Sequence, residues 1–181
     1  MAALPQSHLR LSDLTTRRAT DFALIPTAEE RRAVADTLGI VGVRKLRLSG
    51  KIEPLGSRDW TLTAMLGATV VQDCVVTLEP VTTRLDEPVH RSYLAELPDI
   101  DAAEVEMPED DTAEALPETL DLGQVMIEAL SLALPLYPRK DGADLGEAVF
   151  TAPGSTPMTD EDAKPFAGLE ALRDQLQKKG D

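Results

Sequence analysis

The stretch VVQDCVVTLEP, residues 70–80, lies at the centre of the pattern that decides the fold. Apolar residues alternate with polar or smaller ones over 60–66 before it, and a second alternating set runs over 81–93 after it. A period of two on both sides of a Glu-Pro break predicts two long strands, near 60–76 and 81–95, joined by a tight turn. Pro80 has no backbone N–H, so it belongs in the turn or at the first position of the second strand. Gly67 predicts a bulge where the first strand bends.

Further strands and helices are predicted on either side of this hairpin. The patterns mark strands near 40–54 and 21–26 and helices near 27–38 and 121–134. Thr27 and Glu30 form a capping box for the first helix, and Asp121 with Gln124 caps the second. The predicted fold class is α+β: an antiparallel meander with two helices packed against it. The sequence leaves open whether the sheet closes into a barrel.

The net charge of −14 over 181 residues is distributed unevenly along the chain. Residues 1–95 carry 12 Lys and Arg against 11 Asp and Glu, a net of +1, whereas residues 96–181 carry 6 against 21, a net of −15. The acidity therefore follows the hairpin, as in a neutral domain that carries an acidic segment.

Composition also predicts the domain organisation. Residues 96–121 hold 11 acidic residues and no Lys or Arg, so we expect a flexible acidic loop inside one α+β domain that spans 1–140. Residues 141–181 are expected to be a linker followed by a short amphipathic helix that starts at Pro165. That helix, with Phe166 on its apolar side, would dock on its own domain or on a partner.

The compartment follows from what the sequence lacks. The chain has one cysteine, no signal peptide and no apolar run near the ~20 residues that a membrane helix needs. We therefore expect a soluble cytoplasmic protein with no membrane partner.

Cations gather on one predicted strand face. Lys45, Arg47 and Lys51 alternate with apolar residues, with Arg44 beside them, and Arg139 with Lys140 follows the second helix. Such a row of cations suits phosphate groups of a nucleic acid. The alternative is a polar outer face that keeps the sheet soluble, or an edge guarded by lysine.

No catalytic or metal-binding pattern is evident. Cys74 with His90 as base would be a possible nucleophile pair, but the chain lacks a third member and a nucleophile elbow, which favours a buried structural cysteine. The acidic side chains of 99–111 do not have the spacing of a calcium loop. The residues point to no cofactor, no metal and no small-molecule substrate.

Three blocks of the sequence resemble a known family. QDCVVTLEP at 72–80, DLGQ at 121–124 leading to YPR at 137–139, and PFAGLEAL at 165–172 appear in the order found in the YceD family, the large ribosomal RNA subunit accumulation proteins, in an alphaproteobacterial-type form. Many family members carry Cys-x-x-Cys at the turn, where this chain has Thr77 in place of the second cysteine. No thiolate pair is therefore present to hold zinc. The residues carried over, most of them structural in character, are Cys74, Leu78, Glu79, Pro80, Asp121, Leu122, Gly123, Pro138, Arg139, Pro165 and Phe166.

The resemblance implies a ribosome-biogenesis factor rather than an enzyme. We expect it to promote accumulation of the large-subunit (23S) rRNA by binding that RNA, or a basic large-subunit ribosomal protein. The alternatives are a protein–protein adaptor that never touches nucleic acid and a small enzyme that depends on Cys74.

Overall fold

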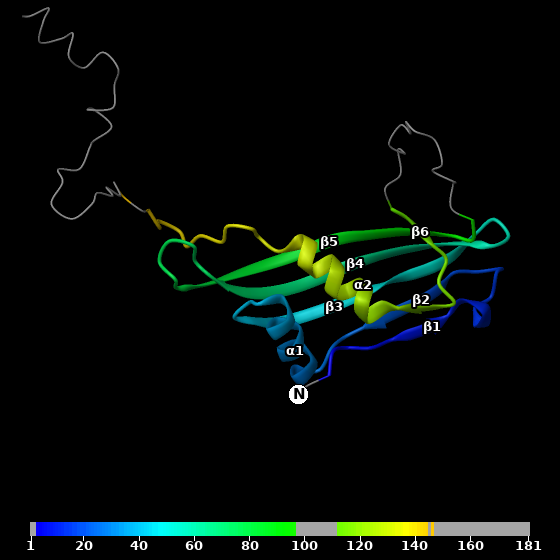
Figure 1. Ribbon diagram of the computed structural model, residues 1–181, viewed down its shortest axis with the longest axis horizontal. Coiled ribbons are helices and arrows are strands. Elements are labelled where there is room, and N and C mark those ends of the chain that lie inside the picture. Colours follow the sequence, from blue (N-terminus) through cyan, green and yellow to red (C-terminus); the bar gives the residue numbers. More distant parts are fainter. Residues whose placement is uncertain (1–2, 97–111, 145, 147–181) are drawn as a thin grey trace, which may run out of the picture. The chain divides into compact units, whose positions relative to one another are not determined.

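The computed structural model describes residues 3–96, 112–144 and 146, and its elements confirm the predicted α+β class. Five strands form an open sheet in the order β2 (Thr20–Leu24), β3 (Gly42–Leu55), β4 (Asp59–Asp73), β5 (Pro80–Leu94) and β6 (Ala113–Ala115). A two-stranded sheet pairs β1 (His8–Arg10) with β7 (Thr119–Asp121), and a short 3-10 helix, Leu11–Asp13, follows β1. The helices are α1 (Ala28–Leu38) and α2 (Leu122–Ala133) (Figure 1). The main sheet does not close into a barrel.

The central hairpin has the predicted position, with two corrections. β4 and β5 pair from Trp60 opposite Tyr93 to Asp73 opposite Pro80, which places Pro80 at the first strand position. β4 ends at Asp73, so the apolar residues that follow it lie in the turn and not in the strand. The predicted bulge at Gly67 is wrong, because the register runs through that residue without interruption. The irregularity is in β3 instead, between Val43 and Lys45.

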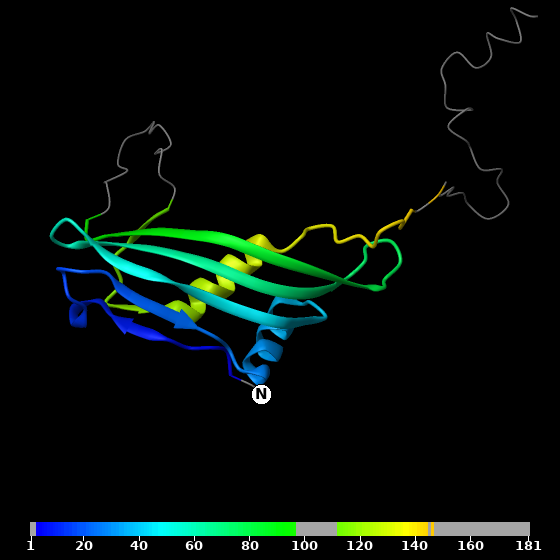
Figure 2. The same cartoon turned by 180° about the vertical axis from the view of Figure 1, so that it is seen from behind.

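One face of the main sheet carries the core. Inward residues of β3 and β4 such as Leu48, Ile52 and Leu62 are fully buried, and they pack in one cluster with Met126 and Leu130 of α2. α1 and the β1–β7 pair lie on the same side as α2, so that the sheet stands in front of α2 when seen from behind (Figure 2). The opposite face of the sheet has no helix over it among the described elements.

Both predicted helix caps form, although the second differs in detail. Thr27 accepts from the Glu30 N–H at 3.3 Å while the Glu30 carboxylate accepts from the Thr27 N–H at 2.7 Å, which confirms the capping box. Asp121 caps α2, but its Oδ1 accepts from the N–H of Gly123 at 2.9 Å rather than from Gln124.

The first residues of the chain pack against the beginning of α2. A side chain at Gly123 would place its Cβ 1.9 Å from the carbonyl oxygen of Pro5, so only glycine permits this approach. The Leu122 N–H donates to the Ser7 carbonyl at 2.9 Å and continues the contact into the β1–β7 pair.

The acidic segment is only partly within the described residues. Over 112–121, where we expected flexible loop, the chain instead forms β6 and β7, because each finds a pairing partner elsewhere in the fold. Residues 97–111 and the predicted C-terminal helix with Pro165 and Phe166 lie outside the described residues. The division of the chain at residue 140 stays a prediction. No helix within the described ranges is long and apolar enough to cross a membrane.

β5 is an edge strand over most of its length, because β6 pairs only with Ser92–Leu94. The Ser92 N–H points toward β6, where it donates to the Thr112 carbonyl at 3.0 Å. The backbone N–H and C=O groups of the even-numbered residues before it therefore point to the uncovered edge. Pro88 belongs to that row and removes one of its donors. This is a usual protection of an edge against pairing with another chain.

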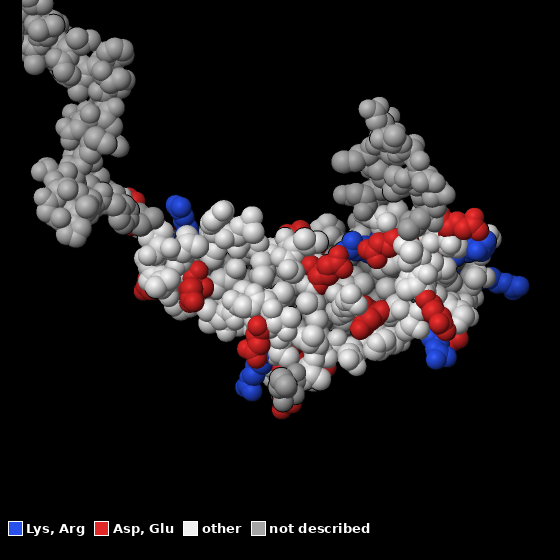
Figure 3. All heavy atoms as spheres, in the orientation of Figure 1, with Lys and Arg blue, Asp and Glu red and all other residues white. Residues whose placement is uncertain are grey.

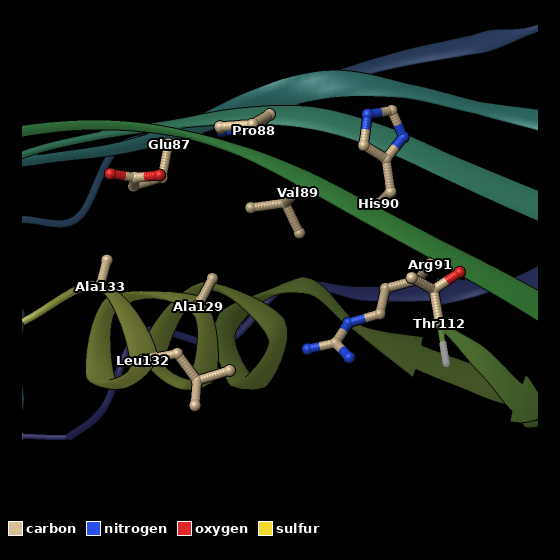
Figure 4. A pocket seen from close by; sticks show the side chains of 9 residues that line it. All are labelled: Glu87, Pro88, Val89, His90, Arg91, Thr112, Ala129, Leu132 and Ala133. Atoms are coloured by element: carbon tan, nitrogen blue, oxygen red, sulfur yellow. The ribbon is translucent and has the colours of Figure 1, made fainter. Parts of the chain in front are cut away.

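Arg91 fastens β5 to α2 from the inner face of the sheet. Its side chain extends from β5 toward the helix (Figure 4) and is only 17% exposed. It forms ion pairs with Glu128 of α2 at 2.7 Å and with Glu114 of β6 at 3.1 Å. Three elements are thus joined at one guanidinium group.

Candidate nucleic-acid interface

The face of the sheet without helices carries the predicted row of cations. In β3 the side chains of Lys45, Arg47 and Lys51 alternate with the buried Leu46 and Leu48, which places all three on the open face. Lys45 and Arg47 are exposed, and neither side chain has a hydrogen bond or ion pair with another described residue. These two cations are therefore available to a ligand.

Two other cations of the same face are already paired. Lys51 forms an ion pair with Glu53 at 2.7 Å. Arg84 of β5 binds Asp86 through two nitrogens, and this hydrogen bonding lowers the pKa of the Asp86 carboxyl. The pair lies over Gly67, where a Cβ would come within 3.0 Å of the Arg84 guanidinium. The accessible positive charge of the open face thus centres on Lys45 and Arg47.

Arg44 lies at the bulge and not in the regular alternation of β3. The bulge in β3 breaks the alternation, so that Arg44 lines a hollow beside α1. Arg31 and Arg32 of α1 line the same hollow, although no pattern in the sequence marks these two residues as part of a site. Two consecutive cations after the buried Val43 are the sequence signal that could have revealed the break in alternation.

Arg139 and Lys140 lie beside the turn that joins β4 to β5. Both are exposed, and Lys140 Nζ contacts the Glu79 carboxylate at 2.8 Å, which lowers the pKa of Glu79. The Val75 N–H donates to the carbonyl of the buried Pro138 at 2.9 Å. The predicted cations are thus arranged in three groups: the open face, the hollow beside α1 and the turn.

Cys74 closes this turn from inside. Its N–H donates to the Glu79 carbonyl at 2.8 Å, and its Sγ accepts from the N–H groups of Lys140 at 3.4 Å and Thr77 at 3.5 Å. The thiol is fully buried. Hydrogen bonding by the Thr77 side chain and by the backbone of Lys140 and Thr77 outweighs burial and lowers the pKa of Cys74 to about 6.

The geometry separates Cys74 from His90, the base that was considered for it. His90 lies ten residues along β5 from Pro80, about 33 Å away at a rise of 3.3 Å per residue. A Cys74–His90 pair is therefore excluded. Within the described ranges no three His, Cys, Asp or Glu side chains are grouped to hold a metal ion, and the acidic residues of 99–111 lie outside those ranges.

The two faces of the sheet differ in charge. Figure 3 shows the helix-covered side, where Asp and Glu side chains are spread over the region of α2 and β6 and most Lys and Arg lie at the margins. Glu128, Glu114 and Asp121 belong to this side. Such a surface repels phosphate.

The comparison with known families identifies the chain. Residues 62–173, which are 112 of the 181, match the family model described as "Large ribosomal RNA subunit accumulation protein YceD". The chain belongs to the YceD family. The family name implies a role in the accumulation of large-subunit ribosomal RNA and describes an accumulation factor rather than an enzyme. Searches of curated proteins and of solved structures gave no significant match.

The YceD match covers the turn and α2 but not the cationic strand. It starts within β4, so Arg44, Lys45, Arg47 and Lys51 precede it. Most of the family-motif residues within the described ranges form contacts inside the fold, whereas Arg139 is exposed. Cys74, Leu78 and Glu79 shape the turn, with Leu78 in the left-handed conformation at φ 58°. Pro80 begins β5, and Asp121 caps α2. The Leu122 N–H donates to the Ser7 carbonyl, and Gly123 packs against Pro5. The Pro138 carbonyl accepts from the turn.

Proposed function

We propose that this YceD-family chain supports large-subunit (23S) rRNA accumulation without catalysis, by binding the RNA through the open face of its sheet. The observation that carries the proposal is the exposure of Lys45 and Arg47 on that face with no described carboxylate paired to either. Cations that no carboxylate neutralises can displace the counterions of a phosphate backbone, which is the main source of affinity for nucleic acids.

The shape of the face supports this proposal. β3, β4 and β5 are long strands, and most outward side chains of β4 are short or polar, as with Thr61, Thr63 and Thr69, whereas Met65 is a half-exposed apolar one. An extended strand of RNA would therefore find a broad surface without steric obstruction from α1 or α2. We place this action in the cytoplasm.

A cellular experiment tests the proposal. Cells that lack the protein are supplied with the Lys45→Glu/Arg47→Glu variant, and the level of mature 23S rRNA is compared with that restored by the wild-type chain. We expect the variant to fail to restore it. Arg17→Glu/Arg18→Glu, which makes the same change of charge at two exposed arginines elsewhere, serves as the control. Full restoration by the open-face variant would reject RNA binding by that face.

The helix-covered face favours a second candidate, an adaptor that binds a basic ribosomal protein. That face carries acidic side chains (Figure 3), and Leu132 of α2, labelled in Figure 4, is a strongly exposed apolar residue. Leu136 and Tyr137, which follow α2 in the chain, are also strongly exposed. If this candidate holds, the chain would bind a basic large-subunit protein at low salt, and the open-face variant would bind it equally well. An enzyme that uses Cys74 is tested separately, because Cys74→Ser would then abolish the effect on rRNA.

A further inference from the structure

A hollow of about 430 Å³ lies where α1 faces the beginning of β3. Its charged wall consists of Arg31, Arg32 and Asp36 from α1 and Arg44 from β3. The rest of the wall is formed by small or apolar residues, namely Ala35, Val41, Gly42, Val43, Val71 and Pro80. The hollow is a different place from the open face, and no local pattern in the sequence predicts it.

The hollow has more donors than acceptors. Three guanidinium groups and one carboxylate give it a net charge of +2. None of the three arginines forms an ion pair within the described part of the chain. Arg31 donates from Nη1 to the Pro26 carbonyl at 2.7 Å, but its Nε is buried with no acceptor among the described residues. The Nε of Arg31 is enclosed by the fold, so the charge that a ligand could reach comes mainly from the exposed Arg32 and Arg44.

The bulge in β3 connects this hollow with the open face. Lys45 and Arg47 point to the open face, whereas Arg44, the residue before Lys45, lines the hollow on the α1 side. β2 pairs with β3 only from Leu48 onward, so no strand covers the edge of β3 between the two groups. A continuous line of cations therefore passes from the open face around this edge to α1.

We propose that the hollow binds a phosphate of the RNA backbone, so that a strand crossing the open face passes around the free edge of β3 and is gripped by Arg31, Arg32 and Arg44. This inference rests on the proposed RNA binding and adds a built phosphate subsite to it. The planar fork of arginine matches the oxygens of a phosphate. No aromatic side chain lines the hollow, so no base stacks there, and the contact is independent of sequence.

The test compares two variants of the full chain. Arg32→Gln/Arg44→Gln removes two charges from the hollow at exposed positions, and Arg17→Gln/Arg18→Gln removes two exposed charges elsewhere. Affinity for single-stranded fragments of large-subunit rRNA is measured between about 50 and 200 mM salt. In the hollow variant the slope of log affinity against log salt should become shallower by about 1.4, at about 0.7 per lost contact. The control should leave the slope unchanged. Circular dichroism confirms that both variants are folded.

Three results would overturn the inference. A hollow variant with the slope of the control would show that the arginines do not contact the backbone. Saturation of the hollow by inorganic phosphate alone, lost in the variant while RNA binding is unchanged, would show a free phosphate as the ligand. A variant that weakens binding to one RNA sequence only would show base recognition. If Lys45→Glu/Arg47→Glu also binds RNA like the wild type, the proposed RNA binding by the open face is rejected, and the subsite that rests on it is rejected too. If that variant alone weakens binding, only the subsite fails.

Discussion

The backbone N–H of Lys140 donates a hydrogen bond to the Sγ of Cys74 at 3.4 Å, although 66 residues separate them in the chain. The segment after α2 is thereby fastened to the turn between β4 and β5. The ion pair between Lys140 and Glu79 strengthens the same contact from the exposed side. Because the Val75 N–H also donates to the Pro138 carbonyl at 2.9 Å, the two blocks that carry the YceD resemblance, 72–80 and 137–139, are one structural unit at the end of the hairpin.

The stability of the protein should depend on pH through Cys74. The pKa of the folded thiol is lowered from 9.0 to about 6, so the folded state binds the proton less tightly than the unfolded state does. This contribution to stability is fully present above about pH 9 and is lost as the pH falls through about 6. The free energy of unfolding, measured by urea denaturation, should therefore rise between pH 6 and 9 by more in the wild type than in Cys74→Ser. Parallel curves for the two proteins would mean that the thiol does not titrate in this range.

The Thr77 hydroxyl should be the main cause of this shift. Thr77→Val removes the largest of the hydrogen bonds that lower the pKa, so the thiol pKa of Cys74, read from ultraviolet absorbance of the thiolate, should move back toward its ordinary value. Val76→Thr, a change at the preceding position, is the matched control and should leave the pKa close to 6. Equal titration curves for wild type and Thr77→Val would contradict the assignment.

The link between β5 and α2 should appear as a coupling between Arg91 and Glu128. A double-mutant cycle of Arg91→Met and Glu128→Gln should give a coupling energy of about 1 kcal/mol, because the guanidinium is mostly buried while the carboxylate is half exposed. Arg91→Met alone should cost more, roughly 1–3 kcal/mol, since it also leaves Glu114 without its partner. Additive single effects in urea denaturation would show that the pair contributes nothing.

Gly123→Ala should destabilise the protein even though alanine favours helices. The added Cβ would meet the backbone of Pro5, so the first residues must separate from α2, at a cost of about 1–3 kcal/mol. Gln124→Ala, at the next and exposed helix position, should change stability by a few tenths of a kcal/mol at most. Faster amide exchange in β1 should accompany the loss, because Ser7 and β1 follow the displaced segment. Unchanged exchange in β1 would mean that the segment adapts without separating.

The parts of this fold that could be predicted are the local ones. Alternation placed Lys45 and Arg47 on one face, and the Thr27–Glu30 spacing specified a cap, because both depend only on near neighbours. The β1–β7 pair and the Cys74–Lys140 contact join distant segments, and no period in the sequence reports such pairings. The hollow beside α1 was missed for the same reason.

The position of the bulge could not be predicted from residue type alone. We predicted a bulge at Gly67 because glycine often marks a bend in a strand. Here its missing side chain makes room for the Arg84–Asp86 pair. The true break follows Val43, where two consecutive cations cannot both belong to one face of a regular strand. Local charge pattern was thus a better guide to the break than glycine.

Binding of a large-subunit rRNA fragment to the wild-type chain and to Lys45→Glu/Arg47→Glu, titrated with salt, tests the central claim most directly. Affinity of the wild type should fall with salt at a slope of about −0.7 per phosphate contact, and the variant should show a shallower slope by about 1.4. A steep slope in the wild type that this variant flattens, and that Arg17→Glu/Arg18→Glu does not, would establish RNA binding by the open face. Absence of binding at low salt, or identical slopes for both proteins, would contradict it and direct attention to a basic protein on the helix-covered face.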